Sequence, residues 1–252
     1  MSSSSTTADV ASRPRGRFRR TDPLSGTPSA NRRREVKFAL PSGDAQTLGS
    51  VLEANCRRVQ YGGASSLVKS IYFDDFQMSA YSESLDGVGI RAKVRLRWYG
   101  DDERSLFFEV KRRIGRAVEK VRVPIDSDSD LTAMHFPTID SGLRSILPRT
   151  LAQTLTVYSE PILIVSYTRH YFEAYDAPLR ITVDTDIQCY DQRDHRRPNL
   201  RFGRPLAGLV VLEGKMPVRL EVALPRLLYP LRPIVTRSSK YVMACDALGL
   251  VR

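Results

Sequence analysis

The feature that most constrains the fold is a strict alternation of residue types from position 90 to position 99, in the stretch IRAKVRLRWY. Apolar side chains occupy the even positions, and cations occupy Arg91, Lys93, Arg95 and Arg97. A period of two predicts a β-strand with one apolar face and one face of four positive charges. Because like charges at this spacing repel, the strand needs a counter-charge that it does not itself carry.

Other segments of the chain also have the composition of β-strands, and short polar turns between them favour antiparallel hairpins. The eight predicted strands are 32–40, 68–74, 89–99, 105–114, 117–125, 162–174, 179–190 and 208–215. Helical spacing predicts helices at 44–59 and 77–84, a mostly helical insert at 128–157, and helical segments at 219–231 and 239–248. We therefore predict an α+β fold, an antiparallel eight-stranded β-barrel with peripheral helices, closed because long open strand edges promote aggregation.

The charge of the chain restricts its partners. It has 39 Lys and Arg against 28 Asp and Glu, a formal net charge of +11, which favours nucleic acid, anionic lipid or phosphate compounds. No apolar run approaches the roughly 18 to 20 residues of a membrane-spanning helix. The three cysteines, Cys56, Cys189 and Cys245, are scattered, which argues against disulfides or a zinc site. We predict a cytoplasmic protein, because free cysteines fit a reducing compartment.

The first 31 residues differ in composition from the remainder of the chain. They are rich in Ser, Thr, Pro and Arg and poor in apolar residues. Such a segment is typical of a disordered basic tail and lacks the apolar stretch of a secretory signal. We therefore predict a disordered tail at 1–31 and one domain at 32–252.

When each predicted strand is phased by two, one face of the sheet collects cations and a few carboxylates. This face carries Glu35, Lys37, Arg91, Lys93, Arg95, Arg97, Glu109, Lys111, Arg113, Lys120, Arg122, Tyr167, Arg169, Tyr171, Arg180, Thr182, Asp184, Asp186, Glu213 and Lys215. The opposite faces are apolar and are expected to pack against the helices. A solvated side of an ordinary sheet is the alternative, but such a side mixes both charges more evenly. If the sheet closes, the cations line its interior, where a polyanion must offset the cost of buried charge.

Three glutamates on this face, Glu35, Glu109 and Glu213, help to choose the polyanion. A nucleic acid gains nothing from carboxylates among lysines. Mg²⁺ or Mn²⁺, in contrast, takes oxygen ligands from one or two carboxylates and from phosphate. Carboxylate, metal and phosphate with flanking Arg and Lys indicate phosphoryl transfer. Asp184 and Asp186 are expected either to hold arginines in place or to assist the metal.

Nine motifs, in order along the chain, resemble those of a known family: REVKF, SIYFDD, KVRLRWYG, FFEVKRR, EKVRV, SYTRHYF, LRITVDTDI, VLEGK and SSKYV. They resemble the VTC domain, the polyphosphate polymerase catalytic domain of the vacuolar transporter chaperone proteins, in the CYTH or triphosphate tunnel metalloenzyme superfamily. The resemblance covers about residues 32–248. It implies an eight-stranded antiparallel tunnel with a basic interior. It also implies metal-dependent transfer of the γ-phosphate of ATP onto a growing polyphosphate chain, with Mn²⁺ or Mg²⁺.

The resemblance further implies roles for residues of this chain. The phosphate-binding and catalytic set is Lys37, Arg95, Arg97, Lys111, Lys120, Arg169 and Lys240, with Glu213 as the metal ligand. Strand phase adds Arg91, Lys93, Arg122, Tyr167 and Lys215 as candidates for substrate binding, and Glu35 and Glu109 as candidates for the metal. The ExExK signature of the superfamily is incomplete, because Arg33 stands at its first position, and this favours the polymerase.

Two alternatives stay open: a hydrolase of tripolyphosphate or nucleoside triphosphate with the same tunnel, and a non-catalytic polyphosphate-binding module. The expected partners are ATP and inorganic polyphosphate or triphosphate, without nucleic acid, and a membrane-associated partner is a further option. His170 lies on the opposite strand face and is expected to pack rather than to catalyse. The arginine-rich stretch from Asp191 to Arg204 is expected to be a surface loop, with contact to product at a tunnel mouth as the alternative.

Overall fold

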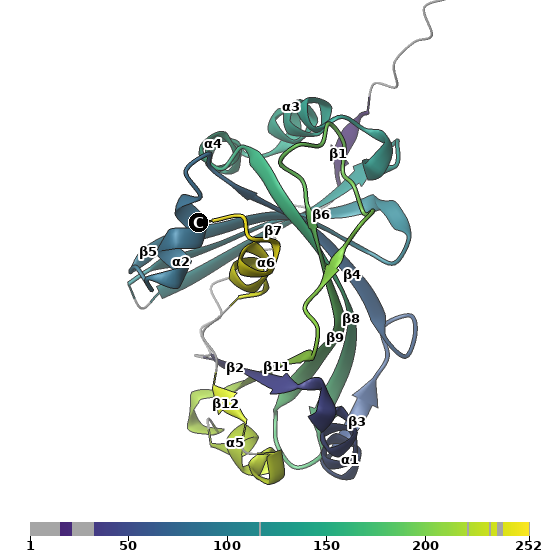
Figure 1. Ribbon diagram of the computed structural model, residues 1–252, viewed down its shortest axis with the longest axis vertical. Coiled ribbons are helices and arrows are strands. Elements are labelled where there is room, and N and C mark those ends of the chain that lie inside the picture. The colour runs from purple at the N-terminus through teal and green to yellow at the C-terminus, as the bar shows by residue number, and fades with distance from the viewer. Residues whose placement is uncertain are drawn as a thin grey trace, which may run out of the picture.

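One curved antiparallel sheet organises the protein, with helices at its two ends and in its opening (Figure 1). The computed structural model describes residues 16–21, 33–115, 117–220, 222–231, 233–235 and 239–251. The strands are β1 (Phe18–Arg20), β2 (Arg33–Pro41), β3 (Cys56–Val59), β4 (Ser66–Asp74), β5 (Ile90–Tyr99), β6 (Asp102–Ile114), β7 (Ala117–Ser127), β8 (Glu160–Ala174), β9 (Arg180–Asp191), β10 (Arg204–Pro205), β11 (Leu209–Pro217) and β12 (Ile234–Val235). The α-helices are α1 (Ala45–Asn55), α2 (Ser79–Leu85), α3 (Phe136–Ile146), α4 (Arg149–Val157), α5 (Ala223–Leu227) and α6 (Lys240–Leu248). None of the helices in these ranges has the length and apolarity to cross a membrane.

The predicted strands are all present in the sheet. They are β2, β4 to β9 and β11, so the predicted α+β fold with antiparallel strands is confirmed. The sheet runs in the order β1-β7-β6-β5-β4-β8-β9-β11-β2-β12, with β10 paired to β9 and β3 paired to β8. The helix predicted at 44–59 ends at Asn55, because Cys56 takes an extended backbone and begins the pairing of β3 with β8.

The expectation of a closed eight-stranded barrel was wrong. The sheet has 12 strands in the described part of the chain, and its two ends do not pair with each other. Strand β1 pairs with the free edge of β7, and β12 pairs with the free edge of β2. Short strands thus cover the edges that closure would have joined. Side chains still meet across the curl, because Lys111 of β6 lies 3.4 Å from Glu35 of β2.

Strand β1 lies within the segment predicted to be a tail. Phe18 is buried, and it packs so closely on Gly142 of α3 that a Cβ there would stand 2.3 Å from the Phe18 ring. The backbone of β1 pairs with β7 from Ile125 to Ser127. The other positions of the predicted tail, 1–15 and 22–31, lie outside the described residues. One aromatic side chain therefore anchors a strand that composition did not indicate.

The apolar strand faces form two cores on the outside of the sheet. One lies between β4–β7 and the helices α3 and α4, and includes Trp98 and Leu143. The other joins β2, β8, β9 and β11 to α1 and α5, and includes Phe38, Leu52 and Leu224. In Figure 1, α3 and α4 lie at one end of the sheet, and α1 and α5 lie at the other. The prediction that the apolar faces pack against helices is confirmed. The cations and carboxylates are left for the inside of the curl, where helix α6 covers a third apolar cluster.

Helix α6 lies in the opening of the sheet, against its inner face (Figure 1). The Tyr241 ring stacks on Tyr72 of β4 with centroids 5.3 Å apart, and its hydroxyl donates to Asp74 at 2.6 Å. Asp74 is fully buried and also accepts from three backbone N–H groups within residues 75–81. Because a buried carboxylate needs such donors, this network ties α6 to β4. It also fixes Lys240, the first residue of α6, against the inner face.

Candidate functional site

The candidate site is the inner face of the curved sheet, and β5, β6 and β7 show how its charges are placed. Gly100 and Gly115 close the two hairpins with φ of 60° and 59°, a region that favours glycine. The resulting register puts Arg95 opposite Glu109, and Lys93 opposite Lys111. Side chains that are opposite each other on one face lie about 5 Å apart, so these charges act on one another directly.

Glu109 of β6 is the centre of the first charge cluster and is only 2% exposed. Its Oε2 atom accepts from Arg95 Nε at 2.6 Å and lies 3.7 Å from Arg97 Nη1. Its Oε1 atom lies 3.3 Å from Lys120 Nζ and 3.6 Å from Arg122 Nε. Burial raises the pKa of the Glu109 carboxyl, but the surrounding cations outweigh burial and hold the pKa well below its usual range. One carboxylate therefore orders four cations.

Asp184 of β9 is the centre of the second cluster and is completely buried. Arg169 of β8 donates to it twice, with Nε–Oδ1 2.6 Å and Nη2–Oδ2 2.8 Å. Lys240 Nζ lies 2.5 Å from Oδ2 and 4.7 Å from the centre of the Tyr167 ring. Burial raises the pKa of the Asp184 carboxyl, but Lys240 and Arg169 hold it below its usual range. Of the two roles expected for Asp184, these contacts show the holding of an arginine.

Strands β2 and β11 form the third cluster, in which acidic and basic residues alternate. Glu213 is opposite Lys37, and Lys215 is opposite Glu35. The Lys37 ammonium lies between both carboxylates, 3.1 Å from Glu35 Oε1 and 3.5 Å from Glu213 Oε2. Lys215 lies 2.8 Å from Glu213, and Lys111 of β6 completes the cluster from across the curl through its 3.4 Å contact with Glu35.

Glu35 and Glu213 are the two carboxylates that fit a divalent metal. Burial raises the pKa of each, but the neighbouring lysines hold both values below the usual range, so both groups stay ionised. Both reach one cation, the Lys37 ammonium, and carboxylate oxygens are ligands that Mg²⁺ and Mn²⁺ prefer. Within the described residues, no three His, Cys, Asp or Glu side chains group closely enough to hold a metal. A metal at this pair would therefore complete its ligands with water or phosphate, whereas Glu109 is enclosed by cations.

Lys93 of β5 differs from the other cations of this face. No carboxylate in the described part of the chain forms an ion pair with it, and Lys111 is its cross-strand neighbour. Burial and then repulsion by neighbouring cations, Lys37 first, lower the pKa of Lys93 to about 7. An anion beside Lys93 would favour its charged form and raise the pKa again. This position therefore favours an anion that comes from outside the chain.

Two hydroxyl groups that orient arginines were missed from the sequence. Tyr72 OH accepts from Arg95 Nη1 at 3.1 Å, and Ser70 Oγ accepts from Arg97 Nε at 3.1 Å. Both residues lie on β4, opposite these arginines in the register. The stretch VKSIYFD places Ser70 and Tyr72 on one face, but both faces of β4 carry apolar residues, so alternation did not show which face is the inner one.

The remaining candidates lie at the margin of the inner face or outside it. Arg91, near the start of β5, donates to a backbone carbonyl three residues before it at 2.6 Å. Asp186 accepts from Thr185 Oγ1 at 2.9 Å, and no arginine of the described ranges forms an ion pair with it. His170 is opposite Val183, which belongs to the outer core, so the prediction that His170 lies on the face away from the cations is confirmed.

Comparisons with known proteins identify the family. Two solved structures similar to this chain are the PH1819 protein of Pyrococcus horikoshii OT3 and the HpAC1 protein of Hippeastrum, which is described as having a dominant triphosphatase activity. The first is 13% identical and covers 84% of this chain and 99% of its own, and the second is 16% identical and covers 84% and 94%. Both have a TM-score of 0.49, too low to assign a fold or a function by itself, and no curated protein matches the chain. The VTC domain model, in contrast, matches residues 32–249, and the chain belongs to the VTC domain family.

Proposed function

We propose that the inner face binds ATP and inorganic polyphosphate and transfers the γ-phosphate of ATP to the end of the polyphosphate chain, with Mn²⁺ or Mg²⁺. The observation that carries this proposal is the excess of cations over carboxylates on one partly buried surface. The cations are Lys37, Arg91, Lys93, Arg95, Arg97, Lys111, Lys120, Arg122, Arg169, Lys215 and Lys240, and the carboxylates are Glu35, Glu109, Asp184 and Glu213. Such a surface favours a polyanion, because the carboxylates present are too few to neutralise the cations.

The fixed positions of the cations suit the joining of two polyanions. Two unit charges 4 Å apart repel by about 4 kcal/mol at an effective dielectric constant of ~20, and several such pairs arise when ATP meets a phosphate chain. Arg95 is held by Glu109 and Tyr72, and Arg169 is held by Asp184. These guanidinium groups therefore offer their charge without rearrangement, which is the most effective form of electrostatic stabilisation.

The metal would be held by Glu35 and Glu213 in this proposal. When bound, a divalent metal offsets the charge that develops on the phosphate oxygens it contacts. Lys37, Lys111 and Lys215 surround the same two carboxylates and bind the other phosphate oxygens. Glu109 has a positioning role instead, because it holds Arg95, Arg97 and their neighbours in place.

Transfer to phosphate rather than to water follows from the state of the carboxylates. The pKa values of Glu35, Glu109, Asp184 and Glu213 are all lowered, which makes these groups weak proton acceptors. Activation of water needs a proton acceptor, whereas the end of a phosphate chain already carries a negative oxygen. The inner face is therefore better suited to a phosphate acceptor.

Hydrolysis of a triphosphate is the second candidate, and Lys93 is the observation that favours it. With a pKa of about 7, a fraction of Lys93 is neutral near pH 7 and is able to take a proton from water. A bound polyanion raises this pKa and keeps Lys93 charged, so the same residue becomes a phosphate ligand. Polyphosphate synthesis therefore agrees better with the properties of the site when a polyanion is bound.

The test is incubation with ATP and Mn²⁺, followed by separation of the products on a gel. We expect ADP and phosphate chains longer than any input. Glu213→Gln should abolish metal-dependent turnover and leave the fold intact, because the apolar face of β11 is untouched. Glu119→Gln, at an exposed carboxylate of β7, should keep full activity. Orthophosphate as the sole phosphate product would overturn the polymerase in favour of the hydrolase.

The proposed partners and compartment rest on the same features. ATP and polyphosphate are the partners, and nucleic acid is not expected, because a nucleic-acid surface gains nothing from the carboxylates of the inner face, whereas a metal that binds phosphate uses them. Cys56, Cys189 and Cys245 are buried and unpaired, which fits a reducing compartment such as the cytoplasm. We propose residues 32–252 as the unit that carries the activity.

A further inference from the structure

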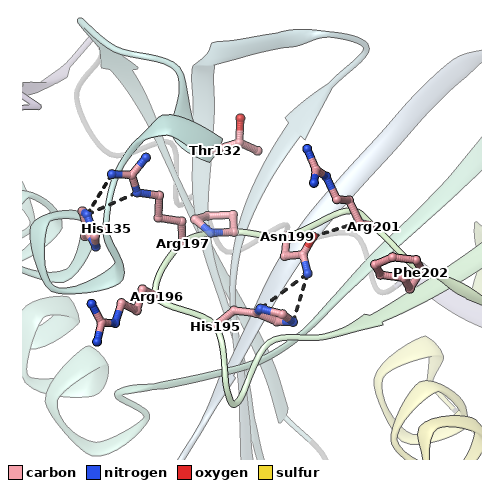
Figure 2. A pocket seen from close by; sticks show the side chains of 9 residues that line it. Thr132, His135, His195, Arg196, Arg197, Asn199, Arg201 and Phe202 are labelled. Carbon is pink, nitrogen blue, oxygen red and sulfur yellow. Dashed lines mark hydrogen bonds between the residues drawn. The ribbon is translucent and has the colours of Figure 1, made fainter.

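A second basic surface lies on the outside of the sheet, on the loop between β9 and β10. We call residues 192–203 the arginine loop. Its Leu200 packs on the outer core that β4–β7 share with α3 and α4, so the loop crosses the face opposite to the candidate active site. The loop and the residues before α3 line a pocket of about 550 Å³ (Figure 2). It is a shallow depression, widely open to solvent.

Hydrogen bonds from one buried side chain hold the arginine loop in one conformation. Gln192 is fully buried, and its side-chain amide donates to the backbone carbonyls of Tyr190, Asp191 and Asn199. Its Oε1 atom accepts from the backbone N–H of Asn199 at 2.8 Å, which closes the loop on itself. The backbone N–H of Phe136, at the start of α3, donates to the carbonyl of residue 196 at 3.0 Å. The pocket therefore has preformed walls.

Three arginines of this loop carry charge that none of the described residues neutralises. No carboxylate of the described residues forms an ion pair with Arg196, Arg197 or Arg201, and all three are exposed. Arg197 donates instead to the ring nitrogen Nε2 of His135 at 3.2 Å, so its described partner is a histidine and not a carboxylate. In Figure 2, Arg196 and Arg197 lie on the side of His135, and Arg201 lies at the other end of the loop. His135 is also the N-cap of α3, and a helix N-terminus attracts anions.

Phe202 at the rim of the pocket is the second unusual feature of the loop. It is 98% exposed, and its φ of 58° lies in the left-handed region, which bulky residues seldom adopt. The next residue is Gly203, and its lack of a side chain permits this backbone path. A Cβ at this position would stand 2.5 Å from the Tyr190 ring. A strained and exposed aromatic residue next to unpaired arginines is the arrangement of a binding surface rather than of a packing contact.

We propose that this pocket is a second binding site for condensed phosphate, either an inorganic oligophosphate chain or the phosphate tail of a nucleotide. Arginine binds phosphate through two parallel N–H groups, and three arginines at separate points along a fixed loop match several linked phosphates better than one. The site lies on the outer face and does not depend on the activity proposed for the inner face. It would hold a phosphate chain at the surface while the inner face is free or occupied.

A local fluorescent reporter tests this site alone. Phe202→Trp places an exposed indole at the rim, and the native Trp98 is fully buried, so a ligand-dependent signal comes from the new side chain. At low salt, titration with inorganic tripolyphosphate should change the emission in a saturable way. Sulfate at equal ionic strength should change it far less. ATP should act like tripolyphosphate, and adenosine should have no effect.

Two triple variants provide matched controls in the reporter background. Arg196→Gln with Arg197→Gln and Arg201→Gln should weaken tripolyphosphate binding at the reporter at least tenfold. Arg149→Gln with Arg219→Gln and Arg226→Gln removes the same charge from exposed arginines elsewhere and should change it less than twofold. Lys93→Gln should leave the reporter unaffected, which separates this site from the inner face.

Each outcome decides for or against the pocket. A response to both tripolyphosphate and ATP identifies the phosphate chain as the ligand, and a response to ATP alone identifies the tail of a nucleotide. No response to either, an equal response to sulfate, a response to adenosine, or equal losses in the two triple variants would overturn the proposal.

Discussion

Two rows of residues lie side by side on the inner face of β5, β6 and β7 and differ in the residue at their centre. The first row is Arg95, Glu109 and Arg122, and the second row, two positions along each strand, is Lys93, Lys111 and Lys120. In the first row a carboxylate lies between two guanidinium groups. In the second row three ammonium groups are neighbours, and like charges directly opposite each other destabilise a sheet.

The two rows show how one surface is both stable and able to bind an anion. Lys111 and Lys120 reach carboxylates outside their row, Glu35 at 3.4 Å and Glu109 at 3.3 Å. Lys93 forms an ion pair with no carboxylate among the described residues. Its pKa is lowered to about 7, because burial and neighbouring cations disfavour its charged form. The row around Glu109 therefore contains a counter-charge of its own, whereas the row around Lys93 depends on carboxylates of other rows and on an anion from outside. Each row makes a different prediction for stability and binding.

The largest effect is expected from removing the charge at the centre of the first row. Glu109→Gln leaves Arg95 and Arg97 without their counter-charge, and breaking a buried ion pair in this way costs roughly 3 to 5 kcal/mol. We expect a decrease of this order in the free energy of unfolding, measured in urea. Glu119→Gln, on the exposed side of the neighbouring strand, should change it by less than about 0.5 kcal/mol.

The pH dependence of stability gives an independent check on Glu109. Its pKa in the folded protein lies below the value of 4.5 for an unperturbed glutamate, so its contribution is complete above pH 4.5 and is lost as the pH falls below that value. The Glu109→Gln variant should lack this part of the acid destabilisation. Parallel acid unfolding curves for the two proteins would show that Glu109 is not the centre of the cluster.

The second row should respond in the opposite direction. Lys93→Gln removes repulsion from Lys111, so without a ligand the variant should be more stable by about 1 kcal/mol, or roughly 2 to 4 °C in melting temperature. Tripolyphosphate should bind to the inner face of this variant about tenfold more weakly, a change of about 1.4 kcal/mol. Calorimetric titration measures the binding. A destabilised variant with unchanged affinity would mean that Lys93 supports the fold and does not bind the anion.

The smallest effect is the pH dependence of binding through Lys93. Without a ligand, its pKa is about 7 in the folded protein against 10.5 for a free lysine, so the folded state releases this proton as the pH rises through 7. The charge of Lys93 therefore destabilises the folded state by its full amount below pH 7, and this destabilisation decreases as the pH rises towards 10.5. A bound anion keeps the proton, so affinity should fall between pH 7 and 9, by at most tenfold per unit.

The comparison of wild type with Lys93→Gln isolates this proton. Both proteins meet the same titration of tripolyphosphate itself, so the difference between their affinity profiles belongs to Lys93. We expect the difference to shrink from pH 7 to pH 9, with proton uptake on binding to wild type alone. A constant difference across this range would place the pKa of Lys93 outside it.

The sequence by itself determined the positions of the main strands and the positive charge of the inner face. Alternation is a local property, so the cations at Arg91, Lys93, Arg95 and Arg97 were assigned to one face without knowledge of any partner strand. The same reasoning located the eight main strands and the apolar faces that the helices cover. These features follow from the two-residue period of an extended chain and from the burial of apolar surface.

Only the tertiary structure decided how the charges are used. Sequence analysis named Glu213 as the metal ligand and Glu35 and Glu109 as further candidates. Register and curvature place Glu109 among four cations and bring the other two to Lys37. The same long-range contacts left the sheet open and placed the arginine loop on the outer face. An ion pair depends on distances of a few ångströms between residues far apart in the chain, and such distances are set by the packing of the whole sheet.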